Sequence, residues 1–145
     1  MIPYCDNGNK TKESTAMETV SEEEIVKAFH MMWDNYPEMV RLIHRSFRVV
    51  AGNPVYLKMG GQVDVKCNTG DPALHRGCQA IASLKSRETK TLTSEMEGVS
   101  WDTYWVPVAG TEDYYVHFTN GMNAFVAKKM AEAAAAQAEP PAAAD

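Results

Sequence analysis

Three β-prone runs follow one another in the second half of the chain, and this arrangement restricts the possible folds more than any other feature of the sequence. The runs span residues 89–96, 101–108 and 114–119. Turn-forming residues separate them, first Glu97-Gly98 and then the segment 109–113. Strands joined by such short turns pair with their neighbours in sequence. The sequence therefore predicts a three-stranded antiparallel meander.

The last of these runs places large side chains on both sides of the sheet. Because side chains in a strand alternate with a period of two, Tyr114, Val116 and Phe118 share one face. Tyr115 and His117 share the other face. An imidazole on a sheet can ligate haem or hydrogen-bond a ligand if it faces a cavity, and it is solvated if it faces water.

A helix is predicted over residues 21–35. Ser21 stands three residues before Glu24 and directly ahead of an apolar run, which is the pattern of a capping box. Pro37 disfavours helical geometry at the residue before it. One stripe of this helix is apolar and consists of Ile25, Phe29, Met32, Trp33 and Tyr36. The stripe must pack against the sheet of its own chain or against a second copy.

Two further short β-prone runs, residues 39–45 and 47–51, have the separation of a hairpin. Asn53-Pro54 then combines a good helix N-cap with the residue best tolerated at the first helical position. Gly60-Gly61 supplies a stop, so one or two helical turns are expected between these pairs.

Two more helices are indicated by apolar spacing. A second core helix is predicted over residues 78–85, with Cys78, Ile81 and Leu84 on one face. Helical spacing resumes after Gly121 and fades into an Ala-rich, Pro-containing sequence.

The 145 residues fit one domain, because a chain of this size buries roughly two-thirds of the surface it exposes when unfolded. Residues 1–18 have few large apolar groups and are predicted to be a disordered lead-in. Residues 19–132 are predicted to form a single domain with flanking helices, and residues 133–145 an Ala/Pro-rich tail.

Charge and hydropathy exclude several classes of partner. The net charge of −5 argues against nucleic acid, whose binding depends on basic surfaces. No run approaches the ~18 apolar residues of a spanning helix, and the first residues lack the apolar core of a signal peptide, so we expect a cytoplasmic protein without membrane contact. Thiols stay reduced in that compartment, so three cysteines do not suggest a disulfide framework.

A polar bridge between Cys67 and Cys78 holds two of these cysteines and His75. Two thiolates and an imidazole suit zinc or a haem iron. A structural zinc site, however, usually has four ligands, in pairs that are separated by only two or three residues. Alternatively, Cys78 is a small core-facing residue and His75 a surface or capping side chain. In a third interpretation the two thiols form a redox- or ligand-responsive lid.

The element order and several short segments resemble those of the PAS domain. These segments are Trp33–Pro37, Leu42–His44, Val49–Asn53, Tyr104–Val108 and Tyr115–Phe118. The resemblance implies an α+β fold, in which a five-stranded antiparallel sheet carries short helices on one face and is flanked by N- and C-terminal helices. It also implies a concave face that holds a small ligand or cofactor, or is simply packed. The Cys-containing flavin motif of light-sensing members is absent.

The resemblance predicts a stand-alone PAS-like sensory or regulatory module rather than an enzyme. Such a module would be a homodimer, bind a small molecule and act through a partner signalling protein, and no cofactor is identified. The alternatives are a haem- or metal-binding redox protein that uses Cys67, His75 and Cys78, or a dimerisation scaffold with a filled core. The candidate ligand-binding residues are His75, Cys78, Cys67, Asn53, Met59, Trp105 and His117.

Overall fold

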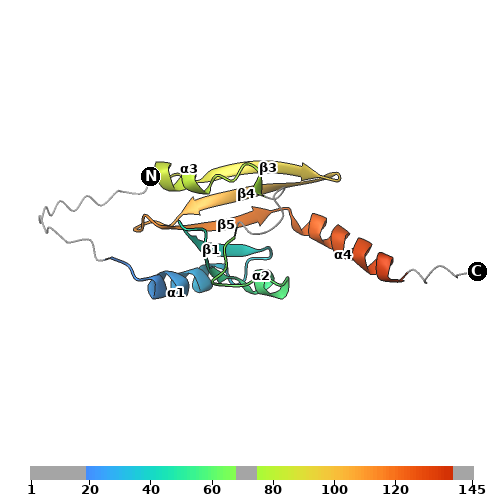
Figure 1. Cartoon of the computed structure of the whole chain (residues 1–145), viewed down its shortest axis with the longest axis horizontal. Coiled ribbons are helices and arrows are strands. Elements are labelled where there is room, and N and C mark those ends of the chain that lie inside the picture. Colours follow the sequence, from blue (N-terminus) through green and yellow to red (C-terminus); the bar gives the residue numbers. More distant parts are fainter. Residues whose placement is uncertain (1–18, 68–74, 139–145) are drawn as a thin grey trace, which may run out of the picture.

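The computed structural model describes residues 19–67 and 75–138 (Figure 1). Along the chain the elements are α1 (Glu22–Trp33), β1 (Val40–His44), β2 (Val49–Gly52), α2 (Pro54–Lys58), α3 (Ala80–Ser86), β3 (Lys90–Met96), β4 (Val99–Pro107), β5 (Tyr114–Asn120) and α4 (Asn123–Ala138). The predicted lead-in, residues 1–18, lies outside the described residues. In the described ranges, no helix has the length and apolar character needed to cross a membrane.

The five strands form one antiparallel sheet in the order β2-β1-β5-β4-β3. This order confirms both the predicted hairpin of β1 with β2 and the meander of β3, β4 and β5. The hairpin and the meander meet where β1 pairs with β5, a contact between segments far apart in the sequence. The predicted α+β class is therefore confirmed.

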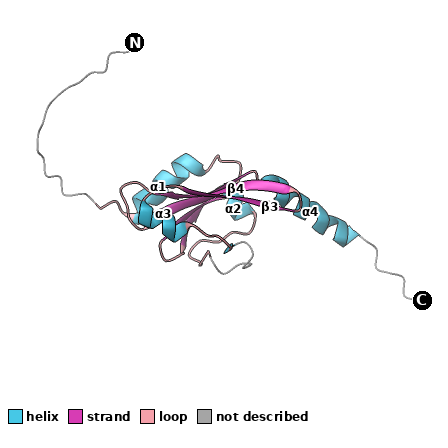
Figure 2. Cartoon of the chain, turned by 90° about the horizontal axis from the view of Figure 1, so that it is seen from above, coloured by secondary structure: helices cyan, strands magenta, loops and turns pink. Residues whose placement is uncertain are grey.

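One face of the sheet packs against α1, and Figure 2 shows α1 and α3 on opposite sides of the edge-on sheet. Ile25 and Phe29 of α1 are buried there, as predicted. The helix begins with the predicted capping box, in which the Glu24 amide donates to Ser21 Oγ and the Ser21 amide donates to the Glu24 carboxylate. Met32 belongs to the predicted stripe but is 74% exposed, so the stripe is only partly covered within one chain.

The opposite face packs against α3, but α3 is turned differently from the prediction. The helix begins at Ala80, so Cys78 precedes it and is exposed. Ala80 and Ser83 are fully buried, whereas Ile81 is 41% exposed. Small residues face the sheet because they let the helix approach the large rings on β4 and β5 closely. The predicted core face of Cys78, Ile81 and Leu84 is correct only for Leu84, which packs against that core.

Helix α4 leaves the sheet and extends away from it (Figure 1). The carboxylate of Glu38 accepts hydrogen bonds from the amides of Gly121 and Met122 and so holds the start of the helix. The helix continues to Ala138, into the predicted Ala/Pro-rich tail of residues 133–145. Alanine has the highest helix propensity, so this stretch forms a helix although it packs against little.

The Asn53 side chain, which is completely buried, joins three parts of the chain. Its oxygen accepts hydrogen bonds from the amides of Val40 (3.0 Å) and Tyr56 (3.1 Å), and the second bond confirms the predicted N-cap of α2. Its amide group donates to the carbonyl of Glu38 (2.8 Å) and more weakly to that of Tyr36. These bonds fix the start of β1 against the start of α2.

Replacing Asn53 by alanine should lower the free energy of unfolding by about 2–4 kcal/mol, because it leaves several buried backbone groups without partners. Urea denaturation monitored by circular dichroism measures this loss. Asn35→Ala is the matched control, since Asn35 is exposed, and its effect should stay within about 0.5 kcal/mol. Equal effects of the two substitutions would contradict the role given to Asn53.

Candidate functional site

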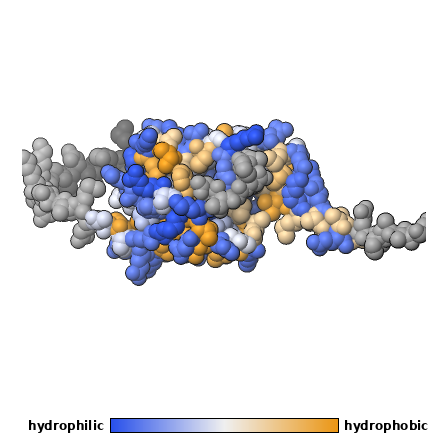
Figure 3. Space-filling view, viewed as in Figure 1, coloured by the Kyte–Doolittle hydropathy of each residue, from blue (hydrophilic) through white to orange (hydrophobic). Residues whose placement is uncertain are grey.

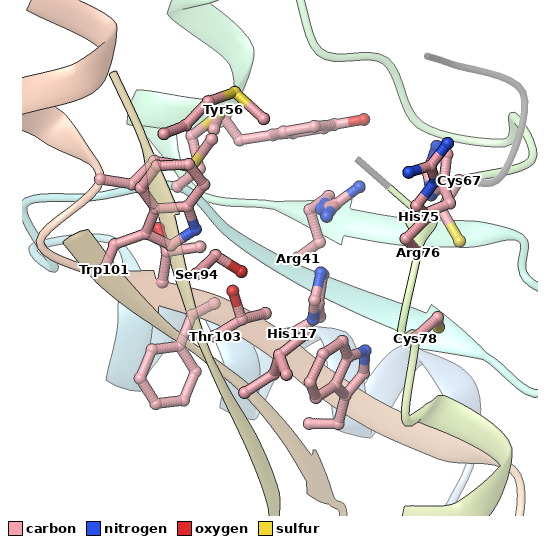
Figure 4. Close-up of a pocket in the computed structure, with 17 residues that line it drawn as sticks. Arg41, Tyr56, Cys67, His75, Arg76, Cys78, Ser94, Trp101, Thr103 and His117 are labelled. Carbon is pink, nitrogen blue, oxygen red and sulfur yellow. The ribbon is translucent and has the colours of Figure 1, made fainter. Parts of the chain in front are cut away.

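A cavity of about 340 Å³ lies against the face of the sheet opposite α1 (Figure 4). Its floor comes from β1, β3, β4 and β5, and its walls from α2 and the segments that carry Cys67 and residues 75–78. The volume lies within the range of small-molecule sites, about 300–1,000 Å³. A dimerisation scaffold with a filled core, by contrast, predicts no such cavity.

Cross-strand pairing determines which side chains lie next to one another on the floor of the cavity. Arg41 on β1 lies directly opposite His117 on β5, and His117 lies opposite Trp105 on β4. Two residues further along β4, Thr103 lies opposite Thr119. Since side chains two apart in a strand share a face, these pairs form successive rows beneath the cavity.

Tyr56 of α2 forms one wall. Its hydroxyl donates to the carbonyl of Gln62 (2.8 Å) and accepts from the Gln62 amide. Gly52 and Gly61 face the ring so closely that a Cβ at either position would overlap it. The absence of side chains at these two glycines therefore allows the ring to stand where it does.

Five of the seven candidate residues line the cavity, namely Cys67, His75, Cys78, Trp105 and His117. Asn53 and Met59 do not line it. The Asn53 side chain is occupied by its hydrogen bonds to the backbone, and Met59 caps the end of α2 with its side chain 43% exposed. Whether the five lining residues bind a ligand stays a prediction.

The cysteines of the polar bridge lie at the cavity as free thiols, Cys67 half-buried and Cys78 exposed. Burial raises the pKa of the Cys67 thiol, which makes it a weak nucleophile at neutral pH. In residues 19–67 and 75–138, no three His, Cys, Asp or Glu side chains are arranged to hold a metal ion. The described residues thus give no support to the metal-binding alternative.

Sequence reasoning missed several lining residues: Arg41, Tyr56, Ser94, Trp101 and Thr103. Arg41 carried a usable signal. It is flanked by Val40 and Leu42, which are both fully buried. A charged side chain inside a strand that is buried on both faces must point into a space that accepts charge.

His117 is held in one tautomer. Its Nδ1 lies 3.1 Å from the carbonyl oxygen of Tyr104, which can only accept, so Nδ1 carries the proton. In the neutral ring Nε2 is then an acceptor. Burial and, to a smaller extent, the nearby Arg41 charge together lower the pKa of His117 to about 3, so the ring is neutral at pH 7.

The PAS domain of Bordetella pertussis BvgS is similar to this chain, with a TM-score of 0.53 and 15% sequence identity. The match covers 78% of this chain and 98% of that domain. The chain has the PAS fold. This confirms the fold that the sequence resemblance implied.

Two further structures from Haloarcula marismortui match less well. A domain of an HTR-like protein has a TM-score of 0.46 and 12% identity, and the match covers 58% of this chain and 96% of that one. The PAS domain of an HTR-like protein has a TM-score of 0.43 and 14% identity, with coverages of 68% and 97%. No protein-family model and no curated protein matches the sequence.

Acid should destabilise the protein partly through His117. The unfolded imidazole takes up a proton near pH 6.5, whereas the folded ring, which faces Arg41 and His75, does so only near pH 3. Protonation therefore favours the unfolded state, and stability should fall by up to about 1.4 kcal/mol per pH unit between these values.

Urea denaturation at several pH values tests this contribution. His117→Asn keeps an N–H donor for the Tyr104 carbonyl but does not titrate, so its free energy of unfolding should fall less steeply between pH 6 and 4. A variant with the same slope as the wild type would show that His117 contributes nothing to the acid sensitivity.

Proposed function

We propose that this protein is a PAS-fold sensory or regulatory module that binds a small molecule in the cavity and signals through protein contacts. The observation that carries the proposal is the 340 Å³ space on the face of the sheet opposite α1, where polar side chains converge among aromatic ones. Ligand sites have this composition, because apolar walls supply binding energy and a few polar groups orient the ligand. No reaction is assigned to the site.

Two helices offer surfaces through which the ligand state could reach other proteins. Helix α4 extends from the core and buries only Phe125, which packs on Trp101 of the cavity floor with ring centroids 5.2 Å apart. Its surface mixes pale orange alanines with blue polar residues on the right of Figure 3. A movement of Trp101 would therefore change the packing of the first turn of α4.

The second surface is an apolar groove of about 390 Å³ beside α1, on the face of the sheet away from the cavity. It runs between the helix and the end of β4, where Val106 and Val108 contribute. Met32 lines it and is 74% exposed. Exposed apolar surface of this kind favours association, and we propose that a second copy covers it in a homodimer.

Filling the cavity should weaken ligand binding. In Ser94→Phe the ring would occupy the space above β3, so small molecules found by ligand-observed NMR screening should bind at least about tenfold more weakly. Ser100→Phe is the matched control, because it makes the same change at an exposed position outside the cavity. Screening without a single hit, or hits that bind both variants equally well, would refute the proposed ligand site.

Sedimentation equilibrium tests the homodimer. We expect the wild type to dimerise and Met32→Glu to weaken the dimer at least about tenfold, since a carboxylate would replace an apolar contact. Met31→Glu is the control, because Met31 is also highly exposed on the same helix but does not line the groove. A monomeric wild type, or equal effects of both substitutions, would overturn this part of the proposal.

A further inference from the structure

The cavity differs in charge from the rest of the molecule. The chain carries 19 acidic and 14 basic residues, which makes it acidic overall. The described residues that line the cavity nevertheless include two arginines, Arg41 and Arg76, and two histidines, but no carboxylate. The interior is therefore a positive region within an acidic protein, and it favours an anionic ligand.

Arg41 is the cation that lies deepest in this region. Figure 4 shows it at the centre of the cavity, with Tyr56 above and His117 below. Its guanidinium carbon lies 5.8 Å from the centre of the Tyr56 ring, a cation–π contact that steadies the group without using its N–H donors. In the described part of the chain, no carboxylate forms an ion pair with Arg41.

The neighbouring arginines are paired. Arg45 lies 3.2 Å from Asp113, and Arg48 binds both Glu22 and Asp64. Arg41 is half-buried, and an arginine that is partly withdrawn from water is more stable with an anionic partner. Among the described residues Arg41 departs from that pattern, and its free donors open into a cavity large enough for a ligand.

The other lining groups indicate what the rest of the ligand is like. His117 is neutral at pH 7 and presents only the Nε2 acceptor, so it adds no positive charge. The hydroxyls of Ser94 and Thr103 lie to the left of Arg41 and His117 in Figure 4. Trp101 and Trp105 are flat, apolar and almost fully buried. This composition suits a planar apolar body with a single anionic group.

We propose that the ligand of this cavity is a small organic carboxylate with an aromatic or similarly flat apolar body, and that Arg41 binds its carboxylate. The inference rests on the proposed ligand-binding function and adds the chemical class of the ligand. The planar fork of a guanidinium matches the two oxygens of a carboxylate and forms two parallel, charge-assisted hydrogen bonds with it. A phosphate carries more charge than the one deep arginine neutralises.

Three probes with the same body test the class: naphthylacetate, naphthylacetamide and naphthyl phosphate. Isothermal titration calorimetry should show that the wild type binds the acid at least about tenfold more tightly than the neutral amide, because only the acid forms charge-assisted bonds. It should also bind the acid more tightly than the phosphate. These comparisons need no variant.

Two substitutions locate the preference. In Arg41→Met the acid and the amide should bind with affinities within about threefold of each other, because the stem remains and the charge is gone. Arg45→Met removes a cation that lies just after the same strand and outside the cavity, and it should keep the preference. If Arg41→Met does not fold, Arg41→Lys serves instead and should reduce the preference, since an ammonium group lacks the planar fork.

The outcomes separate this inference from the proposed function. If the amide or the phosphate binds as tightly as the acid, and Ser94→Phe blocks that binding, the cavity is a ligand site but the carboxylate class is wrong. An acid preference that survives in Arg41→Met would likewise overturn the assignment to Arg41. If none of the three probes binds and the screen gives no ligand that Ser94→Phe excludes, both proposals fail.

Discussion

The buried amide of Asn53 is the interaction on which the rest of the structure depends. It satisfies the amide of Val40, the first residue of β1, and the amide of Tyr56 in the first turn of α2. It also binds the carbonyl of Glu38, whose carboxylate holds the amides at the start of α4. An amide side chain is required here because it accepts and donates at the same time. One hydrogen-bonded chain thus links the strand under the cavity to the helix that leaves the core.

Because Asn53 anchors strand β1, it also fixes which residues of that strand face the cavity. Its alternate residues serve opposite faces: Val40 and Leu42 pack with α1, while Arg41 points into the cavity and Ile43 packs with α3. A slip of one residue in its pairing with β5 would put the arginine among apolar side chains. The bonds of Asn53 to the backbone around the start of β1 oppose such a slip. The hydrogen bonds of Asn53 therefore keep the apolar residues of β1 in the core and Arg41 in the cavity.

Local physics explains which parts of the fold were predictable from the sequence. Capping at Ser21 and Asn53 and the period-two pattern of Tyr114–Phe118 depend on neighbouring residues alone, and each was confirmed. The orientation of α3 was not predictable in this way, because it depends on the bulk of Trp105 and Tyr115, which leaves room only for Ala80 and Ser83. Apolar spacing alone does not predict the full length of α4, because its last turns are held by the helix propensity of alanine and not by packing.

The candidate site was harder to predict than the fold because cross-strand pairing creates it. Nothing near Arg41 in the sequence shows that it lies opposite His117, more than seventy positions away. Their pairing places a charged group beside a neutral one. A guanidinium stays protonated in proteins, whereas the imidazole beside it gives up its proton when it is buried. The floor therefore holds one permanent positive charge next to one neutral acceptor, and the register of β1 on β5 is what sets this asymmetry.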